Sequence, residues 1–191
     1  MKKKEEIKII FGLGNEGKEF ESSRHNIGKE IVNFYIKERN EGRGFYFSEY
    51  NHLILASNKG YMNESGKSVK EVLKFFKLKP ENLLVIHDEA DLVFPLFKVS
   101  FASGSGGHKG VESIFKEIKS KNFWRFRIGI QKRKRVLAGN LVLTRWTDEE
   151  KKILDKIKKE FKIILEKLEK KLPNELNLSK DYFLKLNERK N

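Results

Sequence analysis

A short run of branched apolar residues near the start of the chain leads directly into three closely spaced glycines. Residues 7–11 (IKIIF) have the composition of a buried strand, and Gly12, Gly14 and Gly17 follow at once. An apolar run of this length, closed by glycines, is typical of a core strand. The glycines predict a tight turn at the carboxyl end of that strand and a loop of unusual backbone angles after it.

Strands and helices alternate along the rest of the chain, which predicts an α/β fold. Because the middle strands look hairpin-like, we expect a three-layer sandwich with a central mixed, twisted sheet flanked by helices. A single domain is expected over residues 1–191, with a core at about 7–172 and a polar tail at 173–191. Apolar spacing predicts strands at 45–50, 53–57, 83–86, 97–101 and 126–130, and helices at 27–39, 69–76, 111–118 and 147–172.

The charge of the chain points to a polyanionic partner. The chain has 41 Lys and Arg against 27 Asp and Glu, a net charge of +14 that attracts nucleic acid or an anionic membrane surface. It has no cysteine, which excludes disulfides, a thiolate nucleophile and Cys-based metal sites, and which fits a cytoplasmic location. No apolar run is long enough for a signal-peptide core or a membrane span.

Three short motifs resemble nucleotide-binding sequences but lack the context that such sites require. The Gly12-x-Gly14-x-x-Gly17 spacing fits a dinucleotide fingerprint, yet residues 18–26 are too polar for the helix that should follow. Residues 66–68 (GKS) end like a P-loop, but five residues separate Gly60 from Gly66 where the motif requires four. Residues 87–91 (HDEAD) spell a helicase-like string with no phosphate loop upstream. We therefore expect no nucleotide cofactor.

Two other segments each allow a structural and a functional interpretation. Residues 104–107 (GSGG), directly before a predicted helix, form either a flexible connector or a backbone cradle for an anion. Residues 132–135 (KRKR) form either a solvated basic run or a phosphate-binding patch. The residues alone leave both alternatives open.

Five polar residues lie just past predicted strand ends, where α/β proteins place their chemistry: Asn15, His25, Asn63, Asp88 and His108. A histidine can take a proton from water near neutral pH, and a carboxylate on its other nitrogen orients the ring. His25 and Asp88 would make such a pair, with water as the nucleophile and carboxamides as donors to an oxyanion. The chain's four histidines lack metal-ligand spacing, so no metal is expected.

Six segments between residues 7 and 146 resemble the bacterial-type peptidyl-tRNA hydrolases, in the family's order and approximate spacing. The predicted last helix resembles the family's C-terminal portion less specifically. The six segments are residues 9–17 (IIFGLGNEG), 23–28 (SRHNIG), 61–66 (YMNESG), 85–92 (VIHDEADL), 104–110 (GSGGHKG) and 126–130 (FRIGI).

The resemblance implies a monomeric, metal-free enzyme that hydrolyses the ester between a peptide and the 3′-terminal ribose of tRNA. It implies that His25 is the general base, that Asp88 is its partner, and that Asn15 binds near the terminal adenosine and the scissile ester. Asn63 would bind the peptide main chain. Tyr61, Met62 and His108 would line the peptide channel, and Phe20 and Lys109 are further implied substrate contacts. Lys121, Arg125 and Arg127 would contact acceptor-stem phosphates.

The chain departs from the family pattern at three positions near these segments. Lys109 stands where the family has Asn, Glu16 replaces the usual Pro, and Phe20 stands where Tyr is common. We expect Lys109 to approach a substrate carbonyl or the 3′-end phosphate. The Lys109 departure leaves one alternative to an enzyme, a catalytically weak RNA-binding module on the same fold.

Overall fold

The computed structural model describes residues 6–185 and contains one mixed sheet of seven strands in the order β2-β3-β4-β1-β5-β7-β6. The central strands β4, β1, β5 and β7 are mutually parallel, whereas β2, β3 and β6 run antiparallel to their neighbours. This arrangement confirms the predicted mixed sheet. The strands are β1 (Ile9–Gly12), β2 (Asn40–Gly42), β3 (Phe45–Tyr50), β4 (Leu53–Asn58), β5 (Leu83–Val93), β6 (Phe97–Phe101) and β7 (Trp124–Gln131).

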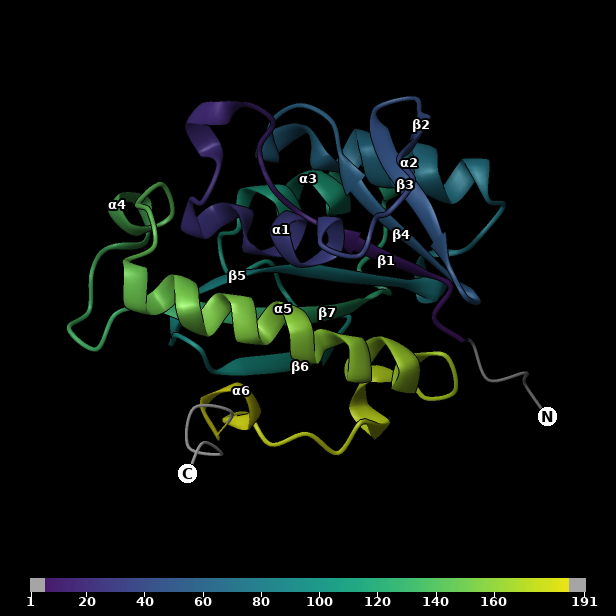
Figure 1. Cartoon of the computed structure of the whole chain (residues 1–191). Helices are drawn as coiled ribbons and strands as arrows, with labels where there is room; N and C mark the ends of the chain where they lie inside the picture. The colour runs from purple at the N-terminus through teal and green to yellow at the C-terminus, as the bar shows by residue number, and fades with distance from the viewer. Residues whose placement is uncertain (1–5, 186–191) are drawn as a thin grey trace.

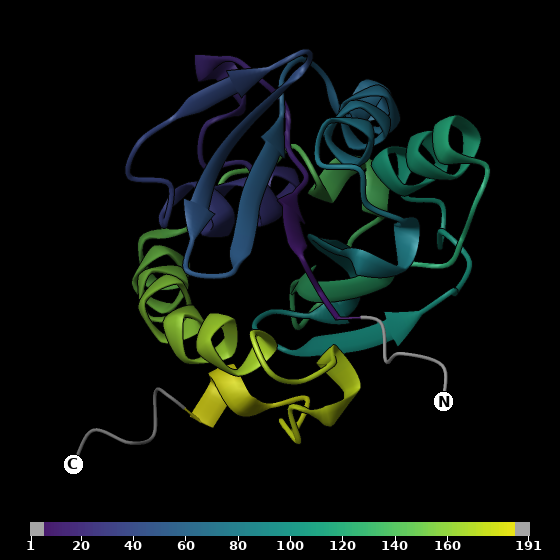
Figure 2. The same cartoon turned by 90° about the vertical axis from the view of Figure 1, so that its right-hand side faces the viewer.

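Helices cover both faces of the sheet, which confirms the predicted three layers (Figures 1 and 2). Side chains of α1 (Ile27–Asn33) and α5 (Asp148–Leu168) share one buried cluster with the sheet. Side chains of α2 (Ser65–Phe75) and α3 (Lys109–Ile118) share the other. Short elements complete the chain: α4 (Ala138–Leu141), α6 (Tyr182–Lys185), and the 3-10 turns η1 (Lys18–Phe20), η2 (Arg24–Asn26), η3 (Met62–Glu64), η4 (Pro80–Asn82) and η5 (Pro173–Glu175).

Two predicted helices are longer than the observed ones. The first was expected to reach residue 39, but α1 ends at Asn33, because the chain turns there to place β2 on the sheet edge beside β3. The last was expected to reach residue 172, but α5 ends at Leu168. Apolar spacing continues past both ends because the following turns also bury apolar side chains, such as the partly buried Leu172.

The strand predicted at 83–86 extends to Val93, so His87 and Asp88 lie within β5 instead of after it. The reason is its partner β7, which pairs Asp88 with Ile128 and Glu89 with Gly129. Polar residues in this part of the strand are therefore held by sheet hydrogen bonding.

The hydrophobic core extends past the boundary expected at residue 172. Leu176 and Phe183 are buried in the same cluster as α5, and the Phe97 N–H at the start of β6 donates to the Lys180 carbonyl. The segment after Pro173 thus packs along the β6 side of the sheet. Residues 1–5 and 186–191, which include the basic N-terminal stretch and the end of the expected tail, lie outside the described residues.

No helix within residues 6–185 has the length and apolarity that crossing a bilayer requires.

Candidate active site

The parallel strands β1, β4 and β5 point their carboxyl ends to one edge of the sheet, and the predicted site residues gather there. Asn15 follows β1, the turn η3 follows β4, and Asp88 lies in the carboxyl half of β5. His25 precedes α1 and His108 precedes α3. Loops at the carboxyl ends of parallel strands commonly form the binding crevice of an α/β sheet.

Two glycines explain how His25 reaches Asp88. A Cβ added at Gly28 would lie 2.1 Å from the Ile86 carbonyl oxygen, and one at Gly12 would lie 2.4 Å from the Gly28 oxygen. Only glycine allows α1 to cross β1 and β5 this closely. The His25 N–H also donates to the Val142 carbonyl oxygen at 2.8 Å, so the backbone before α1 is held from both sides.

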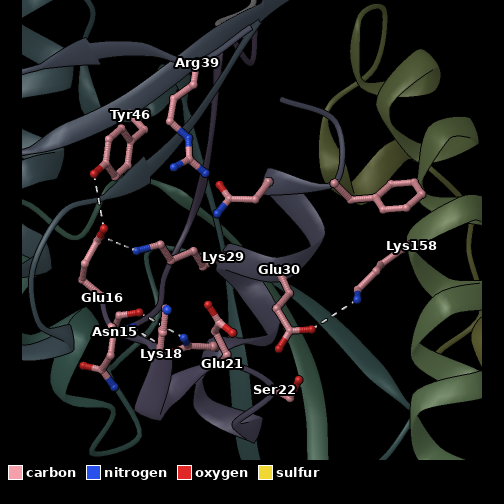
Figure 3. Close-up of a pocket in the computed structure, with 14 residues that line it drawn as sticks. Asn15, Glu16, Lys18, Glu21, Ser22, Lys29, Glu30, Arg39, Tyr46 and Lys158 are labelled. Carbon is pink, nitrogen blue, oxygen red and sulfur yellow. Dashed lines mark hydrogen bonds and ion pairs between the residues drawn. The ribbon is translucent and has the colours of Figure 1, made fainter. Parts of the chain in front are cut away.

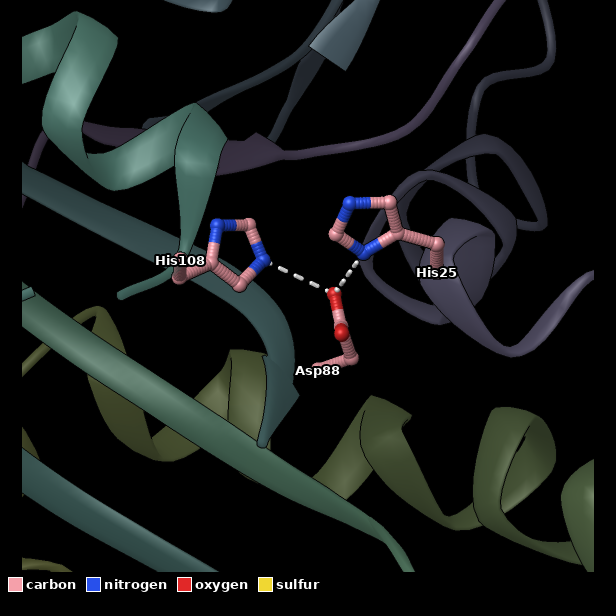
Figure 4. Close-up of side chains that lie close together, drawn as sticks. All are labelled: His25, Asp88 and His108. Carbon is pink, nitrogen blue, oxygen red and sulfur yellow. Dashed lines mark hydrogen bonds and ion pairs between the residues drawn. The ribbon is translucent and has the colours of Figure 1, made fainter. Parts of the chain in front are cut away.

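Asp88 stands between two histidines (Figure 4). Its Oδ1 lies 2.8 Å from Nδ1 of His25 and 2.8 Å from Nε2 of His108, and its side chain is 2% exposed. The two imidazole rings also contact each other, with centroids 4.9 Å apart. The predicted pair of His25 and Asp88 is therefore within hydrogen-bond reach, and His108 joins it as a third member.

Hydrogen bonds assign the tautomers of both rings. Nδ1 of His108 accepts the Val111 N–H at 3.3 Å as the N-cap of α3, so Nε2 carries the hydrogen that is donated to Asp88. The Asp88 carboxylate accepts from His25 Nδ1 in the same way, which leaves Nε2 of His25 with a free lone pair. His25 is thus prepared to accept a proton at Nε2.

The environment shifts both titrating groups. Burial alone would raise the pKa of Asp88, but the two histidines hold that pKa well below its usual range. Burial lowers the pKa of His25, and the charge and hydrogen bond of Asp88 more than offset that effect, so the pKa of His25 is raised above 6.5. Asp88 is therefore a stable buried anion, and its charge makes the His25 imidazole more basic.

A third histidine lies behind the pair. His87 is buried, its Nδ1–H donates to the Asp88 carbonyl oxygen at 2.6 Å, and its ring meets that of His108 edge-on at 4.5 Å. Burial lowers the pKa of His87 well below 6.5, so the ring stays neutral at physiological pH.

His25, Asp88 and His108 are also the residues that a metal ion would use, since their ligand atoms lie within 4.8 Å of one another. The hydrogen bonds argue against that use. A metal on Nε2 of His108 requires the hydrogen on Nδ1, which faces the Val111 N–H that it now accepts. The donor set therefore fits a hydrogen-bonded triad better than a metal centre.

The backbone and the side-chain oxygen of Asn15 are fixed by hydrogen bonds. Its N–H donates to Asn26 Oδ1 at 2.7 Å, its carbonyl accepts from Asn26 Nδ2 at 3.0 Å, and its Oδ1 accepts the Met62 N–H at 2.7 Å. Because Oδ1 is engaged by a donor, Nδ2 is the atom that remains for a substrate oxygen.

A cavity of about 310 Å³ opens at the triad and includes Lys109. Lys109 is exposed and pairs with Glu112 at 3.2 Å, so its ammonium stands at the rim of this cavity. Further lining residues come from the end of β5, from the glycine loop before α3 and from α4: Glu89, Ala90, Asp91, Gly106, Gly107, Ala138, Gly139 and Val142.

The segment after β4 meets the site differently from what was expected. The Tyr61 ring is exposed and contacts the half-buried Phe20 edge-on at 6.1 Å, and Asn63 is exposed. Met62 was expected to line the peptide channel, but its side chain is 4% exposed and packs in the core beside Gly110. Because this side chain is buried, Met62 contacts the site only through its N–H, which donates to Asn15 Oδ1.

The three expected phosphate contacts lie in different environments. Arg125 was expected to contact a phosphate, but it is 1% exposed and donates to the Gly104 carbonyl. Its position in β7 places the side chain under the glycine loop, where a phosphate cannot reach it. Arg127 is half-buried and pairs with Glu89 at 3.1 Å. Lys121 is exposed and lies over the Phe115 ring. Residues 132–135 are all exposed.

Several residues that hold the site together were not recognised from the sequence. Arg24 and Asn26 lie within the segment that carries His25, and Asn58 lies in what looked like a simple turn. What distinguishes these polar residues is that they are buried, and no local sequence pattern reveals that. Glu16 was noted as a departure, but its partner Lys29 was not.

The geometry so far is a hydrogen-bonded His–Asp–His triad beside a cavity at the carboxyl edge of a mixed α/β sheet. A family model described as peptidyl-tRNA hydrolase matches residues 9–185. Peptidyl-tRNA hydrolases of a Sulfurihydrogenibium species and of Aquifex aeolicus are each 36% identical to this chain, over 79% and 86% of it and 85% and 91% of theirs. A crystal structure of the Acinetobacter baumannii peptidyl-tRNA hydrolase superposes with a TM-score of 0.67 at 28% identity, covering 84% of this chain and 89% of that one. The chain belongs to the peptidyl-tRNA hydrolase family.

Proposed function

We propose that this protein hydrolyses the ester between the carboxyl carbon of a peptide, or of an N-blocked amino acid, and the 3′-terminal ribose of tRNA. The observation that carries the proposal is the 2.8 Å bond from His25 Nδ1 to the buried Asp88, which leaves Nε2 of His25 as a base. Membership of the peptidyl-tRNA hydrolase family supplies the substrate class.

The reaction follows from the tautomers. Nε2 of His25 takes a proton from water while the water oxygen attacks the ester carbon, and Asp88 stabilises the imidazolium that forms. The Nδ2 donor of Asn15 stabilises the negative charge that develops on the carbonyl oxygen. The C–O bond to the ribose then breaks, and the proton on His25 passes to the leaving ribose oxygen.

The peptide and the tRNA of the substrate contact different residues around the triad. Asn63 contacts the peptide main chain, and Tyr61 and Phe20 contact the substrate beside it. The Met62 N–H between Tyr61 and Asn63 donates to Asn15 Oδ1, so this segment adjoins Asn15. Positive charge for the tRNA phosphates comes from Arg127, Lys121, Lys109 and the exposed run 132–135. Contacts with phosphates dominate the affinity of a protein for nucleic acid. Arg125 is left out because it is buried.

The proposed enzyme acts without cofactor or metal, as a monomer, in the cytoplasm where tRNA is used. Support for the metal-free reaction comes from His108, whose tautomer serves both the α3 cap and Asp88. Support for a monomer comes from the triad and Asn15, which one chain supplies in full.

The direct test is release of the N-acetyl-aminoacyl group from tRNA, with unblocked aminoacyl-tRNA as the substrate control. Wild type should cleave the blocked substrate. His25→Ala should lower kcat/KM by about 100-fold or more, and Asp88→Asn by about tenfold or more, as expected for loss of a general base or its partner. His52→Ala, which removes an exposed histidine elsewhere, should match wild type.

The result that would contradict the proposal is a folded wild type that binds tRNA and cleaves neither substrate. That outcome would favour the alternative of an RNA-binding module on this fold.

A further inference from the structure

The loop that carries Asn15 is fastened at the residues on both sides of it. Gly14 N–H donates to Asn58 Oδ1 at 3.2 Å, Asn58 Nδ2 donates back to the Gly14 carbonyl at 2.6 Å, and Glu16 N–H donates to the Gly60 carbonyl at 2.9 Å. The position of the Asn15 amide therefore depends on what holds Asn58 and Glu16.

One lysine from α1 contacts both of those residues. The side chain of Lys29 is 11% exposed, and its Nζ donates to Glu16 Oε2 at 2.9 Å and to the Asn58 carbonyl at 2.9 Å. Figure 3 shows the contact with Glu16. The carbon stem of Lys29 covers Gly14, where an added Cβ would meet Lys29 Cβ at 2.6 Å. Lys29 thus touches Gly14, Glu16 and Asn58, which surround Asn15 in the fold.

Glu16 extends the same connection to β3, near the edge of the sheet. Its Oε1 accepts the Tyr46 hydroxyl at 3.2 Å, so one carboxylate joins α1 to β3 across the loop. The pair lies in a cleft of about 660 Å³ that Asn15 also lines. The Lys29 ammonium is buried whereas the Glu16 carboxylate is 43% exposed, so loss of Glu16 would leave a buried ammonium without its counter-charge.

We propose that the Lys29–Glu16 ion pair is a positioning device for Asn15, specific to chains that combine these two residues. The inference rests on the proposed function, in which the Asn15 amide donates to the ester carbonyl. Neither Lys29 nor Glu16 touches the substrate; the pair sets where the Asn15 loop stands relative to His25.

The test compares Lys29→Met and Glu16→Gln with Lys185→Met, which removes an ammonium from the Lys185–Asp181 pair at α6, on the β6 side of the sheet and away from the Asn15 loop. We expect Lys29→Met and Glu16→Gln to lower kcat on N-acetyl-aminoacyl-tRNA by about tenfold to 100-fold with KM nearly unchanged, since small displacements of a positioning group have effects of this size. Lys185→Met should keep the wild-type kcat.

A readout independent of activity is the side-chain amide signal of Asn15 in a ¹⁵N–¹H correlation spectrum of the full chain. We expect it to shift in Lys29→Met and Glu16→Gln and to stay in place in Lys185→Met. This arm decides the inference even if wild type proves inactive, so its failure is distinct from failure of the proposed function.

Two results would overturn the inference. A lower melting temperature with wild-type kcat and an unmoved Asn15 signal would make the pair purely structural. A raised KM with unchanged kcat would make Lys29 a substrate contact. Where Lys29→Met does not fold, Glu16→Gln, which keeps an oxygen acceptor for Lys29, gives the same readouts.

Discussion

Asp88 is the residue on which the site depends, because one of its oxygens serves two imidazoles. Burial of a carboxylate raises its pKa, yet the His25 and His108 donors at 2.8 Å reverse that effect. The result is a buried anion whose charge acts on His25 with little screening by water. His108 has two tasks at once, since it caps α3 and occupies the second lone pair of Asp88 Oδ1.

The pH dependence of kcat/KM should report this arrangement. Below its pKa, His25 carries a proton on Nε2 and cannot accept one from water, so activity is lost as pH falls through that pKa. Because the pKa of His25 is raised, the acid limb should lie above pH 6.5. Asp88→Asn removes the charge that raises the pKa, and its acid limb should move to lower pH. A limb that does not move, or that moves upward, would contradict this assignment.

At the scale of elements, a single buried arginine joins the turn that carries His25 to the rest of the fold. Arg24 Nη1 donates to the Ile130 carbonyl at 3.1 Å, and Nη2 pairs with Glu150 Oε2 at 2.5 Å. The guanidinium also lies 4.5 Å from the centroid of the Trp146 ring. Glu150 is in turn the capping-box residue of α5, so η2, β7 and the start of α5 are held together.

Removal of this connection should cost substantial stability. Arg24→Met leaves the Ile130 carbonyl without its guanidinium donor and Glu150 without its counter-charge, and we expect the free energy of unfolding to fall by about 3 kcal/mol. Urea unfolding followed by circular dichroism measures it. Arg135→Met, which breaks the exposed pair with Asp91, is the matched control and should cost about 0–1 kcal/mol. Equal losses in the two variants would contradict the role given to Arg24.

At the scale of the whole molecule, the net charge of +14 is distributed unevenly over the surface. Residues 132–135 form an exposed basic run beside the cavity, where Arg135 pairs with Asp91, itself a cavity-lining residue. The lysines of α5 alternate with carboxylates instead, as in the pairs of Lys151 with Asp148 and of Lys162 with Glu166. Of these two regions, the first presents the unbalanced charge near the site.

Salt dependence of tRNA binding should separate the two regions. Changing residues 132–135 to glutamine should flatten the slope of log K against log salt by up to about 3, at roughly 0.7–0.9 for each phosphate that the variant no longer neutralises. The same change at Lys151, Lys152, Lys159 and Lys162 of α5 should leave the slope near that of wild type. An effect confined to the α5 variant would place the RNA on the other side of the molecule.

Local patterns predicted most of the strands and helices in order, without β2, and proposed His25 and Asp88 as a pair whose contact only the fold shows. Apolar periodicity reports which face of an element is buried, and the glycines at 12 and 28 permit the close crossing of α1. The continuation of β5 through Asp88 was not predictable, because its length is set by β7, which comes some 35 residues later in the chain.

The pairing of polar residues needed the folded chain. Three contacts illustrate this: His108 with Asp88, Lys29 with Glu16, and Arg125 with the Gly104 carbonyl. The residues of each contact are separated in sequence by a distance that no periodic pattern marks. Packing of the segment with Leu176 and Phe183 against the core is a further case, since its apolar residues are too sparse to predict burial. The sequence therefore specifies the elements and the candidate proton acceptor, because both depend on local patterns. Long-range packing specifies the partners, because a buried polar group is satisfied by whichever donor or acceptor the fold brings to it.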